Sequence, residues 1–217
     1  MIASSTPEFV WYLMRGSGLV ALMLFTLTVS LGVVGVTRLQ SRRWPRLVTS
    51  QLHRNIALLA SCFLALHVGT ALVDSWVGLG WIGALVPFHS GYRPLWVGFG
   101  VVSFDLFLAI LMSSLLRRRI GARLWRLIHW GTWAMWPLAL THALGAGTDS
   151  TQGWGLAICV ICMSTVATAV VWRVRSALRA PKARSSGPRV GARSVRGDAG
   201  VVARPGVEAM VAADSSP

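Results

Sequence analysis

The chain has little charge and few acidic residues. Only 13% of its 217 residues are Asp, Glu, Lys or Arg, and only seven are acidic, whereas 54% are hydrophobic. An ordinary soluble domain has about 25% charged residues. This composition excludes a typical soluble protein and predicts a membrane protein. The length allows a bundle of four to six spanning helices and a tail, without a second folded domain of normal size.

Cysteine is also scarce. The three cysteines, Cys62, Cys159 and Cys162, all lie in apolar segments. An odd number of cysteines in such segments gives no disulfide framework. Cys159 and Cys162 form a CxxC pair, but a single pair cannot complete a four-ligand metal site. We expect both to pack as small residues within a helix.

Long apolar segments account for most of the chain. Each is close to the roughly 20 residues that a helix needs to cross the bilayer, and helix is the structure that satisfies the backbone in lipid. The segments are residues 9–36, 55–73, 95–116, 124–144 and 153–172. The sequence therefore predicts an all-α integral membrane helical bundle with about five transmembrane helices.

The basic residues predict the orientation of this bundle. They are Arg38, Arg42, Arg43 and Arg46 in the first loop, Arg117, Arg118, Arg119 and Arg123 in the third, and Arg173, Arg175, Arg179 and Lys182 in the tail. The other two loops contain little positive charge, so the positive-inside rule places the N-terminus outside and the C-terminus in the cytoplasm. The net charge of +14 is explained by topology, and we expect no nucleic-acid partner.

The pattern of apolar segments and basic residues divides the chain into a transmembrane domain and a tail. Residues 9–174 form the predicted transmembrane domain, and residues 175–217 read as a disordered basic cytoplasmic tail without hydrophobic periodicity. Basic residues of such a tail are expected to touch anionic lipid. Residues 1–8 contain no Lys or Arg, so we expect no signal peptide there.

Four of the five histidines lie inside apolar segments, where histidine is rare and usually functional. His53 and His67 are fourteen residues apart in the second segment, and His129 and His142 are thirteen apart in the fourth. Both helices run in the same direction, so His53 should face His129 near the cytoplasmic surface. By the same argument, His67 should face His142 about 20 Å further along, at 1.5 Å per residue.

Each facing pair suits the axial ligation of one haem iron. No Cys or carboxylate lies near either pair to complete a zinc site, whereas haem binds in an apolar bundle core through axial histidines. The spacing of thirteen leaves an offset of about 140° on an ideal helix. Pro137 lies between His129 and His142, and we expect it to kink or rewind that helix.

The histidine pattern resembles the ferric reductase-like transmembrane domain family. The resemblance rests on His53-x13-His67, His129-x12-His142 and the segments LMRGSGL and SGYRPLWVG, and it covers roughly residues 11–172. The family includes ferric reductases, NADPH oxidases and the haem-binding membrane subunit of the periplasmic methionine sulfoxide reductase system. The resemblance implies two b-type haems, with the four histidines as axial ligands and Arg15 near the haems.

The chain departs from the oxidases of this family in two respects. It has one predicted span fewer than their six, and its 217 residues contain no GxGxxG or similar phosphate-binding pattern. We therefore expect an electron-transfer component without its own flavin or NADPH domain. Its donor would be a separate flavin reductase or a membrane quinol.

Three functions follow as hypotheses. The first is transmembrane electron transfer from a cytoplasmic or membrane donor to an extracytoplasmic acceptor such as a ferric chelate. The second is a haem subunit that feeds a separate extracytoplasmic reductase, such as a methionine sulfoxide reductase. The third is a haem-free membrane scaffold or transporter, in which the histidines bind a metal ion or relay protons. The charge pattern suits a bacterial plasma membrane.

Several other residues have both a functional and a structural interpretation. Arg15 is expected to pair with a haem propionate, or to extend to the outer interface. Asp105 suits an ion pair, a bond to a ligand histidine or a proton relay. His89 and Arg93, on the outer loop, suit binding of an acceptor or plain solvation. The large aromatics between the ligand positions suit packing on the porphyrins or bridging them, or else filling space in the core and against lipid, as large aromatics usually do; they are Trp130, Trp133 and Trp136.

Overall fold

The computed structural model describes residues 8–36, 46–75, 77–147 and 153–179. These residues form helices and contain no strand. The helices are α1 (Glu8–Val36), α2 (Arg46–Val73), α3 (Gly80–Leu85), α4 (Pro94–Leu115), α5 (Arg117–His129), α6 (Thr132–Ala146) and α7 (Gly153–Arg179). The protein is an all-α integral membrane helical bundle, as the composition predicted.

Four of these helices, α1, α2, α4 and α7, are long and apolar enough to cross a membrane. They correspond to four of the five apolar segments of the sequence, although α2 begins earlier and α7 ends later than expected. The helix α7 continues through Arg175 to Arg179, so the boundary predicted at residue 175 lies within a helix. The rest of the predicted tail, residues 180–217, lies outside the described residues.

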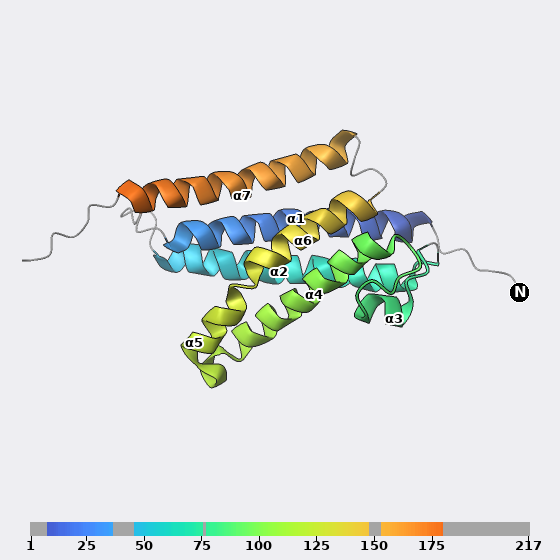
Figure 1. Ribbon diagram of the computed structural model, residues 1–217, viewed down its shortest axis with the longest axis horizontal. Helices are drawn as coiled ribbons and strands as arrows, with labels where there is room; N and C mark the ends of the chain where they lie inside the picture. Colours follow the sequence, from blue (N-terminus) through green and yellow to red (C-terminus); the bar gives the residue numbers. More distant parts are fainter. Residues whose placement is uncertain (1–7, 37–45, 76, 148–152, 180–217) are drawn as a thin grey trace, which may run out of the picture. The chain divides into compact units, whose positions relative to one another are not determined.

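Helix α1 packs along α2 on one side and along α7 on another, while α4 packs against α6 (Figure 1). Buried residues from α1, α6 and α7 form the largest part of one apolar core. Cys159 and Cys162 belong to that core and are 2% and 3% exposed, which confirms that they pack as small residues. Cys62 is exposed.

Polar contacts join the core helices where side chains have no water. The indole of buried Trp136 donates from Nε1 to Thr26 Oγ1 at 3.0 Å, which links α6 to α1. The hydroxyl of Ser103 donates to the carbonyl of Met135 at 2.9 Å, which links α4 to α6. Each bond satisfies a group whose burial without a partner would cost about 1–3 kcal/mol. Trp136 therefore fills the core, in agreement with its structural interpretation.

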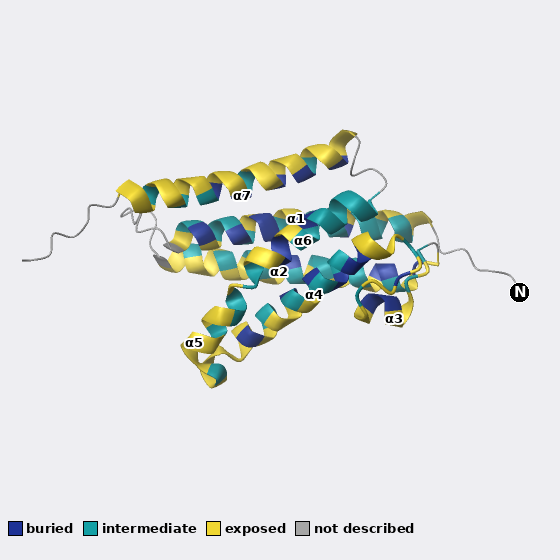
Figure 2. Ribbon diagram, viewed as in Figure 1, coloured by how far each residue is buried: buried dark blue, intermediate teal, exposed yellow. Residues whose placement is uncertain are grey.

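The outer faces of the helices are apolar and exposed, as a lipid-facing surface requires. Figure 2 shows exposed positions along much of α7. Large side chains among them on α7 include Ile161, Met163 and Trp172, at 63%, 50% and 41% exposure. Soluble monomers rarely expose apolar patches of this extent, so these faces fit contact with lipid.

The predicted fourth span, residues 124–144, is not one continuous helix. Helix α5 ends at His129 and α6 begins at Thr132, and the two run in different directions in Figure 1. With 15 residues, α6 is about 22 Å long, which is shorter than the ~30 Å of hydrocarbon in a bilayer. This span is therefore present as two helical pieces joined at Trp130 and Gly131.

The winding of the chain changes at the junction of Trp130 and Gly131. Helix α6 continues through Pro137. At the junction, Gly131, Trp133 and Ala134 each donate their N–H to the carbonyl three residues before, and Trp130 shares its N–H between the carbonyls of Leu127 and Arg126. Such bonds wind the chain by ~120° per residue instead of ~100°. Three to four such steps add about 60–80°, which reduces the offset between the two histidines from about 140° to roughly 60–80°.

Candidate functional site

The four histidines of the apolar segments meet in two pairs. The ring centroids of His53 and His129 are 6.4 Å apart, and those of His67 and His142 are 6.2 Å apart. This confirms that α2 and the α5–α6 segment bring the histidines together in the predicted combinations. The pair of His53 and His129 is named the inner pair, and the pair of His67 and His142 the outer pair.

The separation within each pair has the dimension of a metal bridge. A metal about 2 Å from one nitrogen of each ring would hold the two ring centroids a little over 6 Å apart. Among the described residues, no group of three or more His, Cys, Asp or Glu side chains is placed to hold a metal ion. Two protein ligands on opposite sides suit a metal that carries its own in-plane ligands, and a haem iron is such a metal.

Backbone carbonyls orient the rings of the outer pair. Nδ1 of His67 donates to the Met14 carbonyl at 2.8 Å, and Nδ1 of His142 donates to the Trp96 carbonyl at 2.9 Å. Because a carbonyl oxygen only accepts, each Nδ1 carries the hydrogen and each Nε2 keeps its lone pair. Ligand histidines in metal sites have this arrangement, in which the second nitrogen is hydrogen-bonded and the first faces the metal.

Glycines make room for the outer pair. A Cβ added at Gly18 of α1 would lie 2.7 Å from Nδ1 of His67, and one added at Gly100 of α4 would lie 2.5 Å from Nδ1 of His142. Each glycine is four residues after the carbonyl that accepts from the same ring. The missing side chain therefore lets the imidazole reach a carbonyl within a helix, and the two residues act as one unit.

The same unit holds one histidine of the inner pair. Nδ1 of His53 donates to the Thr28 carbonyl at 3.0 Å. Gly32 is four residues after Thr28, and a Cβ added there would lie 3.5 Å from Cε1 of His53. His129 differs, because its Nδ1 is buried and has no hydrogen-bond partner among the described residues. Instead, the indole of Trp125 is stacked on its ring, with centroids 5.1 Å apart and planes at 28°.

These orienting residues were not found from the sequence. The signal that would have found them is the spacing of fourteen, which α1 shares with α2. Gly18 and Gly32 are fourteen residues apart, as are His53 and His67. Two packed helices with matching spacings of glycine and histidine indicate rings that sit against the glycine helix.

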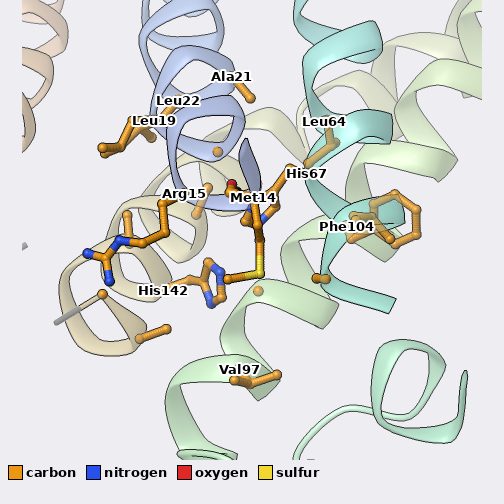
Figure 3. A pocket seen from close by; sticks show the side chains of 18 of the residues that line it. Met14, Arg15, Leu19, Ala21, Leu22, Leu64, His67, Val97, Phe104 and His142 are labelled. Carbon is orange, nitrogen blue, oxygen red and sulfur yellow. Dashed lines mark hydrogen bonds between the residues drawn. The ribbon is translucent and has the colours of Figure 1, made fainter. Parts of the chain in front are cut away.

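A cavity of about 640 Å³ surrounds the outer pair. Figure 3 shows His67 and His142 extending into it from two sides, with Met14, Leu64 and Phe104 around them. Its volume lies within the ~300–1,000 Å³ typical of pockets for small molecules and cofactors. The mostly apolar lining suits a porphyrin.

Arg15 also lines this cavity, and its guanidinium lies over the ring of Trp11, 4.7 Å from the centroid. In Figure 3 it extends away from His67. Glu8, Asp74 and Tyr92 line the cavity as well. The predicted partnership of Arg15 with a haem propionate stays a prediction.

The remaining polar candidates lie apart from the histidine pairs. Asp105 is exposed on α4 and does not line the cavity. His89 is an exposed loop residue, and Arg93 donates from Nη1 to the Gly145 carbonyl at 2.6 Å. That bond gives Arg93 a structural role, since it ties the start of α4 to α6.

Two of the tryptophans between the histidines face outward. Trp130 is 67% exposed and Trp133 is 46% exposed. Neither lines the cavity around the outer pair. Their exposure agrees with the interpretation of lipid-facing bulk.

These features define a class: a multi-pass helical membrane protein in which two facing pairs of histidines are set into an apolar bundle. The chain belongs to the ferric reductase like transmembrane component family, whose model matches residues 17–140, more than half of the 217 residues. No curated protein and no solved structure matches the chain. The matched region contains His53, His67 and His129, and His142 lies two residues beyond its end.

Membership of this family confirms the resemblance found in the sequence. It supports a general role in membrane electron transfer for the chain.

Proposed function

We propose that the chain holds two b-type haems, one between the outer histidines and one between the inner histidines, and that it transfers electrons across the membrane through them. The observation that supports this most directly is the shared geometry of the pairs, with ring centroids 6.2 and 6.4 Å apart. A second support is the backbone acceptor at Nδ1 of His53, His67 and His142.

The residues would divide the work as follows. His67 and His142 would hold the outer haem, and His53 and His129 the inner one. The carbonyls of Met14, Thr28 and Trp96 fix the tautomer and raise the basicity of their histidines. When bound, the haems would serve as one-electron carriers.

The route of the electrons would be determined by the distance between the two histidine pairs. His53 and His67 are fourteen residues apart on α2, so the two proposed centres would lie about 20 Å apart along the helix. The apolar lining of the outer cavity would limit the access of water to the outer centre, and the bonded rings would fix its orientation, which is the part a protein has in cofactor chemistry. With the predicted topology, electrons enter at the inner pair and leave at the outer pair.

We propose a ferric reductase-like activity in a plasma membrane. The donor would be a cytoplasmic flavin reductase or a membrane quinol, and the acceptor a ferric chelate at the outer face. Access for an acceptor there is supported by Tyr12 of α1, which lines the outer cavity and is 64% exposed.

Electron transfer across a sealed vesicle tests the proposal. The purified protein is reconstituted with haem into liposomes that enclose ferricyanide, and dithionite is added outside. We expect the loss of ferricyanide absorbance to depend on the protein and to stop in His67→Ala and His142→Ala. His89→Ala is the matched control, because His89 is exposed on a loop. Equal rates in empty vesicles and in vesicles with the protein would contradict the proposal.

A further inference from the structure

His129 is held differently from the other three histidines, and this difference has a structural cause. We propose that Trp125, with Arg117 behind it, positions the ring of His129 and so takes the part that a backbone carbonyl has for His53, His67 and His142. The inference rests on the proposed function, because it concerns a ligand of the inner haem. Trp125 and Arg117 would thus be positioning residues for His129, in addition to the four histidines.

The pattern of carbonyl and glycine repeats at fourteen residues on two helices. On α1, the Met14 carbonyl with Gly18 serves His67, and the Thr28 carbonyl with Gly32 serves His53. On α4, Trp96 and Gly100 serve His142. The next position of this repeat on α4 consists of Ile110 and Ser114.

This fourth position cannot serve His129 in the same way. A serine replaces the glycine, and the hydroxyl of Ser114 donates to the Ile110 carbonyl at 2.7 Å. The hydroxyl of Ser113 donates to the same carbonyl at 2.9 Å. The carbonyl that would complete the repeat is therefore already bonded, and Nδ1 of His129 is left without an acceptor among the described residues.

Trp125 connects the altered position to His129. Its Nε1 donates to Oγ of Ser114 at 3.3 Å, and its ring stacks on His129 at 5.1 Å. The two residues are four apart on α5, where side chains lie on the same face of a helix. The stack restricts rotation of the imidazole about its bond to Cβ, which is the freedom that the carbonyl bonds remove in the other three histidines.

The guanidinium of Arg117 lies over the indole of Trp125. Its Cζ lies 4.1 Å from the centroid of the Trp125 ring, within the ~6 Å of a cation–π contact. Eight residues of straight helix span about 12 Å, but Gly121 interrupts α5 with φ 79° and ψ 162°. This positive φ favours glycine, and the bend brings Arg117 back over Trp125.

Two consequences follow for the inner haem. Without its stacking partner, His129 loses its fixed orientation, so the inner iron would have a mixture of ligand geometries. The guanidinium of Arg117 places a positive charge near the inner pair, and a positive charge favours the reduced state of a nearby iron. Its removal should therefore shift the inner midpoint potential to a more negative value and leave the outer one unchanged.

The test uses full-length haem-loaded protein and two readouts, the low-spin ferric signals in electron paramagnetic resonance and the two midpoint potentials. Trp125→Leu removes the ring, Trp125→Phe keeps an aromatic face, and Arg117→Gln removes only the charge. Trp130→Leu is the matched control, because it removes an indole one residue from His129 that is 67% exposed.

We expect Trp125→Leu to broaden or shift one of the two low-spin signals, Trp125→Phe to restore it, and Trp130→Leu to leave both unchanged. Arg117→Gln should lower one midpoint potential only. Unchanged signals in Trp125→Leu, or equal effects of Leu and Phe, would overturn the inference. Wild-type protein without haem would instead overturn the proposed function, so the two failures are distinguishable. If Trp125→Leu does not fold, two unchanged potentials in Arg117→Gln overturn the inference.

Discussion

Gly18 and Gly100 show how single residues set the geometry of the outer pair. Each lies where a methyl group would meet the nitrogen of a histidine that bonds to the carbonyl one turn earlier. A substitution as small as alanine must therefore move the ring, because backbone atoms of packed helices cannot yield easily. Adding volume to a tightly packed site typically costs ~1–3 kcal/mol.

Gly18→Ala should displace His67 and remove the outer haem while the inner one remains. Gly16→Ala is the matched control, since a Cβ at Gly16 meets nothing within 4 Å. Both changes raise helix propensity alike, so any difference comes from contact with the histidine. The haem-to-protein ratio of the purified variants measures the effect. A Gly18→Ala protein with the same haem content as Gly16→Ala would refute this reading of the contact.

Single residues also mark the limit of the sequence analysis. The four histidines were identified because imidazoles are rare in apolar segments and these lie at matched depths. Trp125 and the glycines were not, because their contacts depend on which faces of α1, α4 and α5 meet. Asp105 was a candidate for its charge alone, and its exposed position away from the cavity follows from the rotation of α4.

The segment from α5 to α6 shows how local winding brings two histidines onto one face. The spacing of thirteen was a difficulty for an ideal helix, and proline was the obvious cause to consider. The structure instead tightens the chain at Trp130 and Gly131 through bonds between residues three apart. Hydrophobic periodicity does not reveal such a change, because it averages over several turns.

Inserting one alanine between Gly131 and Thr132 should rotate α6 by ~100° relative to α5 and separate His142 from His67. We expect this variant to lose the outer haem. Pro137→Ala, in contrast, should retain both haems, because α6 is continuous through this residue. Haem content, measured for both variants after the same purification, checks the prediction. Loss of a haem in Pro137→Ala with none in the insertion would show that the proline sets the register.

The whole molecule combines a strongly predictable scaffold with a less predictable site. Apolar length and the scarcity of charge predicted an all-helical membrane bundle, and four of its helices meet the requirement for spanning. The direction of α2 relative to the α5–α6 segment, and hence the pairing of histidines, followed from counting spans. The cavity around the outer pair depends on the packing of five helices, α1 to α4 and α6, which no single segment encodes.

The central claim is that one chain binds two haems, each between one pair of histidines. The most direct test is the visible spectrum of the detergent-purified protein, oxidised and then reduced with dithionite, together with the haem-to-protein ratio. We expect sharp low-spin b-type bands, about two haems per chain, and the loss of one haem in either His53→Ala or His67→Ala. Folded protein that is made with haem available and yet shows no absorbance from haem would contradict the account.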